Sequence, residues 1–109
     1  MVSVTKRYEN GKFSFILRED EKEKCECFFS PMTAEISEIS VYTDITDEEK
    51  KAAVLSVLGF LENSGKTEAF YTGEGFEDLF VALGFSKNAE GKYSASLVGY
   101  FSCNCNGKK

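Results

Sequence analysis

The chain contains no histidine, and this absence excludes several kinds of active site. Histidine is the commonest general base in enzymes and the commonest nitrogen ligand for metals. A Cys-His nucleophile pair and a mixed Cys/His zinc site are therefore excluded within this chain.

Long apolar runs and basic clusters are missing as well. No apolar run approaches the roughly 18 residues that a membrane helix needs. The net charge is -5, and no dense block of Lys and Arg occurs apart from the trailing Lys108 and Lys109, so neither nucleic acid nor an anionic membrane is an expected partner. The first residues, "MVSVTKRYENGK", lack the pattern of a signal peptide, and we expect a cytoplasmic protein.

The composition is that of a folded domain. The 109 residues are 42% apolar, with ten Phe and five Tyr, which indicates a globular protein. A chain of this length buries roughly 60 to 70% of its unfolded surface on folding. Because no internal repeat and no long linker divides it, residues 1–109 are predicted to form a single domain.

The first third has the alternation of a strand meander. Strands are predicted over residues 2–8 and 12–20, and Asn10-Gly11 between them is a strong hairpin signal. The charged tract 18–24, "REDEKEK", is interpreted as a solvated turn before a third strand over 25–30. Pro31 ends that strand, and "AEISEISVY" (34–42) is predicted to be a fourth, with Ser37 and Glu38 out of phase.

After Tyr42 the apolar period changes to about 3.6, which predicts a long helix. Its buried stripe is expected to consist of Ala53, Val54, Val57, Leu58 and Leu61. Thr46 and Glu49 have the spacing of a capping box, and Gly65 can end the helix in the left-handed conformation.

The remainder predicts a strand, a short helix and a hairpin. A fifth strand covers 67–71, and "GFEDLFVALGF" (75–85) forms a helix whose apolar side ends at Gly84. A turn at Glu90-Gly91 then leads into a long last strand over 92–103. The predicted fold is α/β of the α+β kind: a mixed, mostly antiparallel sheet with two helices in the order ββββαβαββ.

This order, together with "DLFVALGF", resembles the GNAT superfamily of acyl-CoA-dependent N-acetyltransferases, from about Lys12 onward. The resemblance implies a mixed sheet whose fourth and fifth strands splay apart, here around 39–41 and 69–71, with a cofactor between them. It is carried by "DLFVALGF", which is similar to the family's late helix. The alternative is that Gly84 is only a helix cap and Phe85 only a core residue.

The chain departs from the family where the cofactor's pyrophosphate would bind. The family has a glycine loop there, whereas this chain has "TDITDEEKK" (43–51). Two unit charges about 4 Å apart at an effective dielectric near 20 repel by roughly 4 kcal/mol, so the carboxylates of this turn oppose a diphosphate. We interpret Asp47, Glu48 and Glu49 as residues that cap the helix and complement its dipole.

The family's catalytic groups are also incompletely matched. The resemblance implies a tyrosine acid where this chain has Phe80, which has no proton to give and is interpreted as core. Gly73 stands where the family often has asparagine. Tyr71 is the nearest hydroxyl to the expected cleft, and Glu38 could act as a base, but a packed tyrosine and a solvent-facing glutamate are the alternatives.

Four cysteines form two Cys-x-Cys pairs, Cys25 with Cys27 and Cys103 with Cys105. Residues i and i+2 of a strand face the same side, so each pair places its sulfurs side by side. Four thiolates could bind zinc if the pairs met. The predicted topology separates them, so we expect reduced thiols that pack as small hydrophobic groups, and no metal site.

These observations lead to a functional hypothesis with alternatives. The leading hypothesis is a reduced GNAT-like module that binds a small molecule or a protein without catalysis or cofactor. The first alternative is a divergent acyltransferase, in which the backbone near Val41 and Thr43 would hold acetyl-CoA. A thiol or metal protein is a distant alternative. The edge of the first hairpin, "VSVTKRY", could pair with a second chain to form a homodimer.

Overall fold

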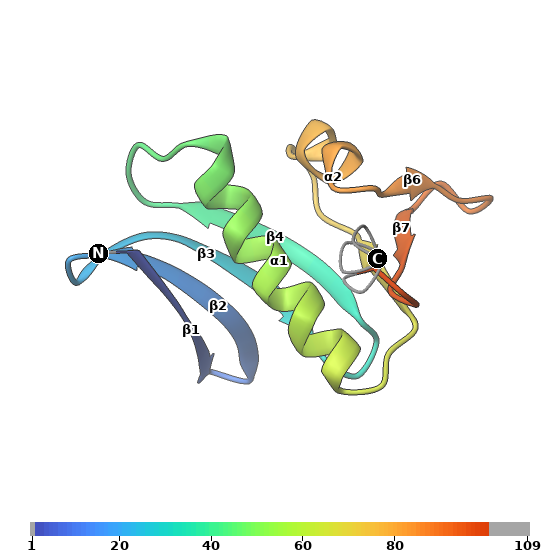
Figure 1. Cartoon of the computed structure of the whole chain (residues 1–109), viewed down its shortest axis with the longest axis horizontal. Helices are drawn as coiled ribbons and strands as arrows, with labels where there is room; N and C mark the ends of the chain where they lie inside the picture. Colours follow the sequence, from blue (N-terminus) through green and yellow to red (C-terminus); the bar gives the residue numbers. More distant parts are fainter. Residues whose placement is uncertain (1, 101–109) are drawn as a thin grey trace, which may run out of the picture.

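The computed structural model describes residues 2–100 and contains a seven-stranded mixed sheet with two helices (Figure 1). The order ββββαβαββ and the α+β class are as predicted. The elements are β1 (Val2–Glu9), β2 (Lys12–Glu19), β3 (Lys22–Ser30), β4 (Glu35–Val41), α1 (Asp47–Asn63), β5 (Glu68–Tyr71), α2 (Glu77–Ala82), β6 (Ser86–Lys87) and β7 (Tyr93–Ser96).

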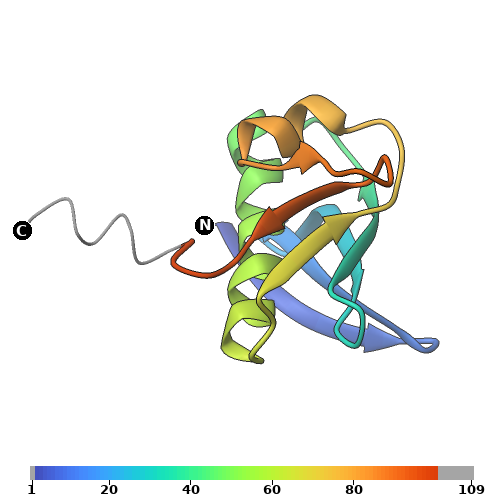
Figure 2. The same cartoon turned by 90° about the vertical axis from the view of Figure 1, so that its right-hand side faces the viewer.

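The sheet has the order β1-β2-β3-β4-β5-β7-β6. Every neighbouring pair is antiparallel except β4 and β5, which are parallel. A parallel pair needs a crossover connection, and α1 provides it. Figure 2 shows α1 lying along one side of the sheet, and the opposite side carries no helix among the described residues.

Two tight turns shape the first three strands. Asn10 and Gly11 take positive φ angles of 55° and 78°, as a two-residue hairpin turn requires. Asp20 and Glu21 form a second such turn, with φ of 52° and 72°. The prediction that the whole tract 18–24 is a solvated turn was therefore wrong, since only two residues turn. Lys24, from the same tract, is only 14% exposed.

A β-bulge explains why the alternation in the fourth strand is broken. Phe28 lies opposite Glu38, and the next residue, Phe29, lies opposite Ile36. Ser37 is thus an extra residue in β4, which shifts the side-chain phase by one. Because of this shift, Ile36 and Ile39 can both be buried in the core.

Helix α1 packs its predicted stripe against the sheet. All five stripe residues are buried, and their partners include Leu17 of β2 and the two cysteines of β3. The ring of Phe60 lies edge-on to that of Phe29, with centroids 5.6 Å apart. Burial of each such side chain stabilises the fold by about 1.5–3 kcal/mol, so the packing of α1 against the sheet contributes substantially to stability.

The C-terminal strands are shorter than predicted. The last strand was expected over 92–103, but β7 ends at Ser96 and the chain turns again at residues 98–100. Gly99 in this turn has a φ of 72°. The hydroxyl of Tyr100 donates to the carbonyl of Leu83, so the turn folds back onto the end of α2. The rest of the predicted strand lies outside the described residues.

Strands β4 and β5 stay together for only two residue pairs, Glu35 with Phe70 and Ile36 with Tyr71. A last hydrogen bond of 2.9 Å joins the amide of Thr72 to the carbonyl of Ile36. The strands therefore part after Ile36 and Thr72. In β5 the splay was expected at residues 69–71. Phe70 and Tyr71 are still paired with β4, so the strands part just beyond this range.

The space where the strands part is occupied by the chain itself. The rings of Tyr71 and Phe80 stack with centroids 3.9 Å apart, and both residues are buried. Gly73 approaches the backbone of Ser37 so closely that a Cβ atom would lie well inside van der Waals contact with its carbonyl oxygen. Only glycine fits this position without a shift of the backbone.

We predict that Gly73→Ala destabilises the fold by about 2 kcal/mol or more, because overpacking against a backbone atom forces the two strands apart. The control is Gly11→Ala, where only the positive φ is unfavourable and nothing lies near the added Cβ, at a cost of about 1 kcal/mol. Urea unfolding measures both. A Gly73→Ala protein no less stable than Gly11→Ala would contradict the close approach.

Candidate functional site

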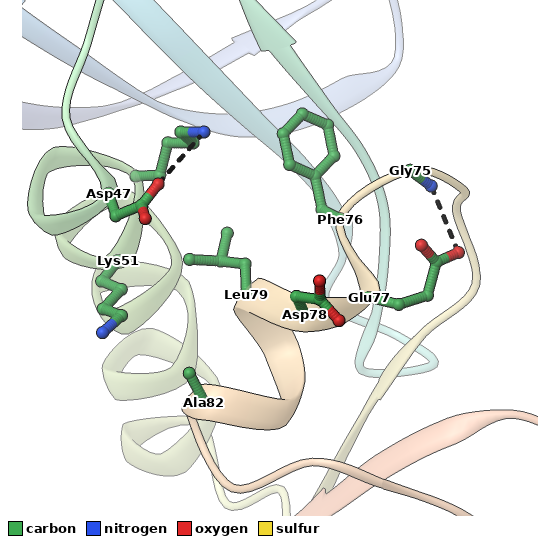
Figure 3. A pocket seen from close by; sticks show the side chains of 9 residues that line it. Asp47, Lys51, Gly75, Phe76, Glu77, Asp78, Leu79 and Ala82 are labelled. Carbon is green, nitrogen blue, oxygen red and sulfur yellow. Dashed lines mark hydrogen bonds and ion pairs between the residues drawn. The ribbon is translucent and has the colours of Figure 1, made fainter.

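A cavity of about 350 Å³ lies between the first turns of α1 and helix α2 (Figure 3). The first turns of α1, whose start is fixed by the N-cap Thr46, form one side of the cavity. Helix α2, which follows β5 in the chain, forms the other side. The lining residues are Asp47, Lys50, Lys51, Gly75, Phe76, Glu77, Asp78, Leu79 and Ala82. Its volume lies within the range of small-molecule sites, about 300–1,000 Å³.

The cavity combines an apolar side with charges of both signs. Phe76, Leu79 and Ala82 supply the apolar surface. Three carboxylates and two ammonium groups surround it, which leaves a net charge of about -1 at neutral pH. Lys50 is partly engaged, since its Nζ lies 3.4 Å from Asp47 Oδ1 and 5.5 Å from the centroid of the Phe76 ring. The arrangement does not favour a polyphosphate.

The N-terminus of α1 is capped by its own side chains, as predicted. The amide of Glu49 donates to the Thr46 hydroxyl at 3.1 Å, and the amide of Thr46 donates to the Glu49 carboxylate at 3.0 Å. Lys24 of β3 also donates to Glu49, at 3.1 Å. The Thr46 amide and then Lys24 lower the pKa of Glu49. The amide of Thr46 is therefore occupied by a carboxylate of the chain, and the amide of Glu49 by a hydroxyl.

Val41 and Thr43, the residues predicted to hold acetyl-CoA if it binds, lie outside this cavity. Val41 is 45% exposed at the end of β4. Thr43 lines a separate cavity of about 400 Å³, together with Lys24 and Asp44. The assignment of Val41 and Thr43 to a cofactor stays a prediction.

The other predicted candidates are not brought together. Glu38 is exposed and accepts a hydrogen bond of 3.1 Å from the Ser40 hydroxyl. Its neighbour Ile39 is buried under α1, so Glu38 faces the opposite side of the sheet. Tyr71 is buried on the helix side, and burial raises its pKa. Phe80 is a core residue, as predicted.

A buried polar cluster on the sheet face away from α1 was not anticipated from the sequence. Glu26 of β3 is only 4% exposed. Its carboxylate accepts hydrogen bonds from the hydroxyls of Ser14 and Tyr42 and, at 3.2 Å, from Nη2 of Arg7. Position 26 lies between two buried cysteines, so the alternation of the strand predicts that its side chain faces the opposite side of the sheet. Its partners lie on β1, on β2 and directly after β4, far from it in the sequence.

The hydrogen bonds of this cluster set the protonation of its members. Burial alone would raise the pKa of Glu26, but the three donors together lower it. Burial and the neighbouring carboxylate raise the pKa of Tyr42 to about 12. Glu26 is therefore ionised at neutral pH and its oxygens are already bonded, which suits a structural link between strands better than a general base.

The cysteines of β3 are core residues. Cys25 and Cys27 are fully buried under α1, as expected for i and i+2 on one face. Burial raises the pKa of both thiols, which makes them poor nucleophiles and poor ligands. Cys103 and Cys105 lie outside the described residues. Within residues 2–100, no cluster of three or more cysteine or carboxylate side chains is placed to hold a metal.

Comparison of the chain with protein-family models, curated proteins and solved structures finds no match. The GNAT resemblance thus stays a prediction from the sequence. Neither described helix is long and apolar enough to cross a membrane.

We predict that Thr46→Ala lowers the free energy of unfolding by about 1 kcal/mol, because the hydroxyl that caps α1 is lost. Thermal unfolding followed by circular dichroism measures the change. The matched control is Thr33→Ala, at an exposed position in the β3–β4 turn, which should leave the midpoint nearly unchanged. Equal midpoints for the two variants would show that the capping box contributes nothing.

We predict that Glu26→Gln lowers the free energy of unfolding by about 2 kcal/mol at pH 7, because the neutral amide leaves buried donors imperfectly paired. The pKa of Glu26 is lowered in the folded state, so its contribution is present above the unfolded value, about 4.3, and is lost as the pH falls through the folded pKa. The difference between wild type and variant should therefore shrink in acid.

Urea unfolding at pH 7 and at pH 3 tests this dependence. Glu38→Gln, the same change at an exposed site of the same sheet face, is the control and should have little effect at either pH. A loss in Glu26→Gln that is equally large at pH 3 would rule out the ionised carboxylate as its cause.

Proposed function

We propose that this chain is a GNAT-like module that binds a small molecule or a protein and does not catalyse acyl transfer. The α+β sheet supports this proposal, since its one parallel pair, β4 with β5, parts after two residue pairs, as the resemblance implies. In this chain, however, the space between the parted strands β4 and β5 is filled by the chain itself.

The observation that carries the proposal is the occupation of that space. The stacked rings of Tyr71 and Phe80, and the backbone of Gly73 against Ser37, fill it from the β5 side. Protein interiors are close-packed, so a pantetheine arm could enter only if these rings moved. Stacked aromatic pairs contribute about 0.5–1.5 kcal/mol beyond their burial, which opposes such a movement.

The groups that would act on an acyl-CoA are also unsuitable. The first turn of α1 is capped by Thr46 and Glu49 and adds the carboxylates of Asp47 and Glu48. Phe80 cannot protonate a leaving thiolate, and Tyr71 has a raised pKa in a buried position. These features support binding without chemistry.

We assign the binding surface to the cavity between α1 and α2. Its apolar side and mixed charges suit a neutral, zwitterionic or cationic group better than a phosphate. Both small molecules and protein side chains present such groups.

A divergent acetyltransferase is the second candidate, and one observation favours it. Residues 37–41 of β4 have no strand partner on the β5 side in the described part of the chain. A pantetheine amide could pair with this backbone near Val41 and Thr43.

A homodimer remains a further prediction. Strand β1 lies at one edge of the sheet, as a pairing edge requires. It also carries Lys6 and Arg7, and charged side chains are a common means of blocking edge pairing.

We predict that acetyl-CoA at millimolar concentration shifts neither the amide resonances of residues 39–50 nor the melting temperature of the labelled protein. The parted strands are filled and the helix start is capped, so no binding energy is available. A saturable shift localised to residues 39–50 would favour the acetyltransferase and overturn the proposal.

A variant with Asp47→Asn and Glu48→Gln separates the two causes. It removes two of the opposing charges but leaves the Tyr71–Phe80 stack in place. If the stack decides, this variant also fails to bind acetyl-CoA. Binding by the variant alone would show that charge, rather than filled space, prevents binding.

A further inference from the structure

Another cavity, of about 510 Å³, lies between the start of α2 and the turn that joins β6 to β7. It shares only Glu77 with the cavity between α1 and α2. Its lining residues are Tyr71, Thr72, Gly73, Glu77, Lys87, Gly91, Lys92 and Tyr93. Figure 1 shows the loop that enters α2 and the hairpin formed by β6 and β7, whose residues line this cavity.

Three of these side chains belong to one row across the sheet. Tyr71 lies opposite Tyr93, and Tyr93 lies opposite Lys87. Directly opposed residues of antiparallel strands project from the same face, so the two phenol rings and the ammonium group share one side. The Nζ of Lys87 lies 5.8 Å from the centroid of the Tyr93 ring.

The hydroxyl of Tyr71 is the unusual group in this row. The residue is only 2% exposed, and no group within residues 2–100 accepts a hydrogen bond from its hydroxyl. Burial raises its pKa, the carboxylate of Glu77 raises it further, and the backbone of Phe76 partly offsets this. Buried polar groups are nearly always hydrogen-bonded, so an unpartnered hydroxyl at a cavity indicates a place for an acceptor.

The charges of the lining favour an anion. Two lysines, Lys87 and Lys92, face one carboxylate, that of Glu77, which already accepts a hydrogen bond of 3.2 Å from the amide of Gly75. Lys92 also forms an ion pair with Glu35, with 3.7 Å between Nζ and Oε2. The residues that line the cavity thus carry two positive charges and one negative charge, in a chain whose net charge is -5.

We infer that this cavity binds a small molecule through a carboxylate or phosphate group. The ammonium groups of Lys87 and Lys92 pair with the anionic oxygens, and the Tyr71 hydroxyl donates to one of them. A hydrogen bond to a charged acceptor is stronger than one to a neutral acceptor, so an anionic oxygen is a favourable acceptor for the buried Tyr71 hydroxyl. The site does not depend on whether the chain binds acetyl-CoA.

The test uses the full chain labelled with ¹⁵N. Inorganic phosphate and acetate are titrated separately into the tens of millimolar, at pH 7 and at an ionic strength held constant with sodium chloride. Saturable shifts are expected at the amides of residues 71–73, 87 and 91–93. A response to phosphate alone or to acetate alone identifies the oxyanion group that is bound, and a response to both shows that the cavity accepts either group. No saturable response of these amides to either anion overturns the inference.

Variants locate the site. Lys87→Gln and Lys92→Gln are each expected to weaken binding of the responding anion about five-fold, as loss of an exposed charge pair does. Lys51→Gln makes the same charge change in the cavity between α1 and α2 and should have no such effect. Equal affinities in these three variants would refute the site.

Tyr71→Phe tests the buried hydroxyl. Its removal leaves no orphaned partner, so the melting temperature should be retained or raised while the anion binds more weakly. An unchanged affinity would overturn the role given to the hydroxyl.

Discussion

The two parallel residue pairs between β4 and β5 are the constraint on which the rest of the structure depends. They join the larger part of the sheet, β1 to β4 under α1, to the smaller part, β5 to β7 beside α2. With so few backbone bonds, this junction relies on side chains. Tyr71 stacks on Phe80, and the absence of a side chain at Gly73 lets the loop close on β4.

The same junction determines where a ligand can lie. Because the space between the parted strands is filled, the cavities lie to either side of the loop that enters α2. One adjoins α1 and carries mixed charge, and the other adjoins β6 and β7 and carries two lysines. Glu77 lines both cavities.

Charge plays different roles on the two faces of the sheet. On the α1 side, Lys24 and Glu49 link β3 to the helix start, and the capping box fixes where the helix begins. On the opposite side, Glu26 accepts hydrogen bonds from Arg7 of β1, from Ser14 of β2 and from Tyr42, which directly follows β4. The carboxylates of Glu49 and Glu26 are both ionised at neutral pH, and both are already bonded to donors of the chain.

The sequence by itself determined the order of elements, the stripe of α1, its cap at Thr46 and the burial of Cys25 and Cys27. These features depend on local periodicity and on backbone preferences within a few residues, which the chain displays directly. It also indicated that the helix start opposes a diphosphate. The tract 18–24 and the end of the last strand were assigned wrongly, because pairing across strands, rather than local composition, sets their limits.

Only the tertiary structure decided the bulge at Ser37, the partners of Glu26, the filled space beside Tyr71 and the lysine-lined cavity. Each of these joins residues that are distant in the sequence, and their meeting depends on strand register. A register shift of one residue moves every side chain to the other face. The local structure can therefore be predicted from neighbouring residues in the sequence, whereas the cavities depend on how β4, β5 and β7 are aligned.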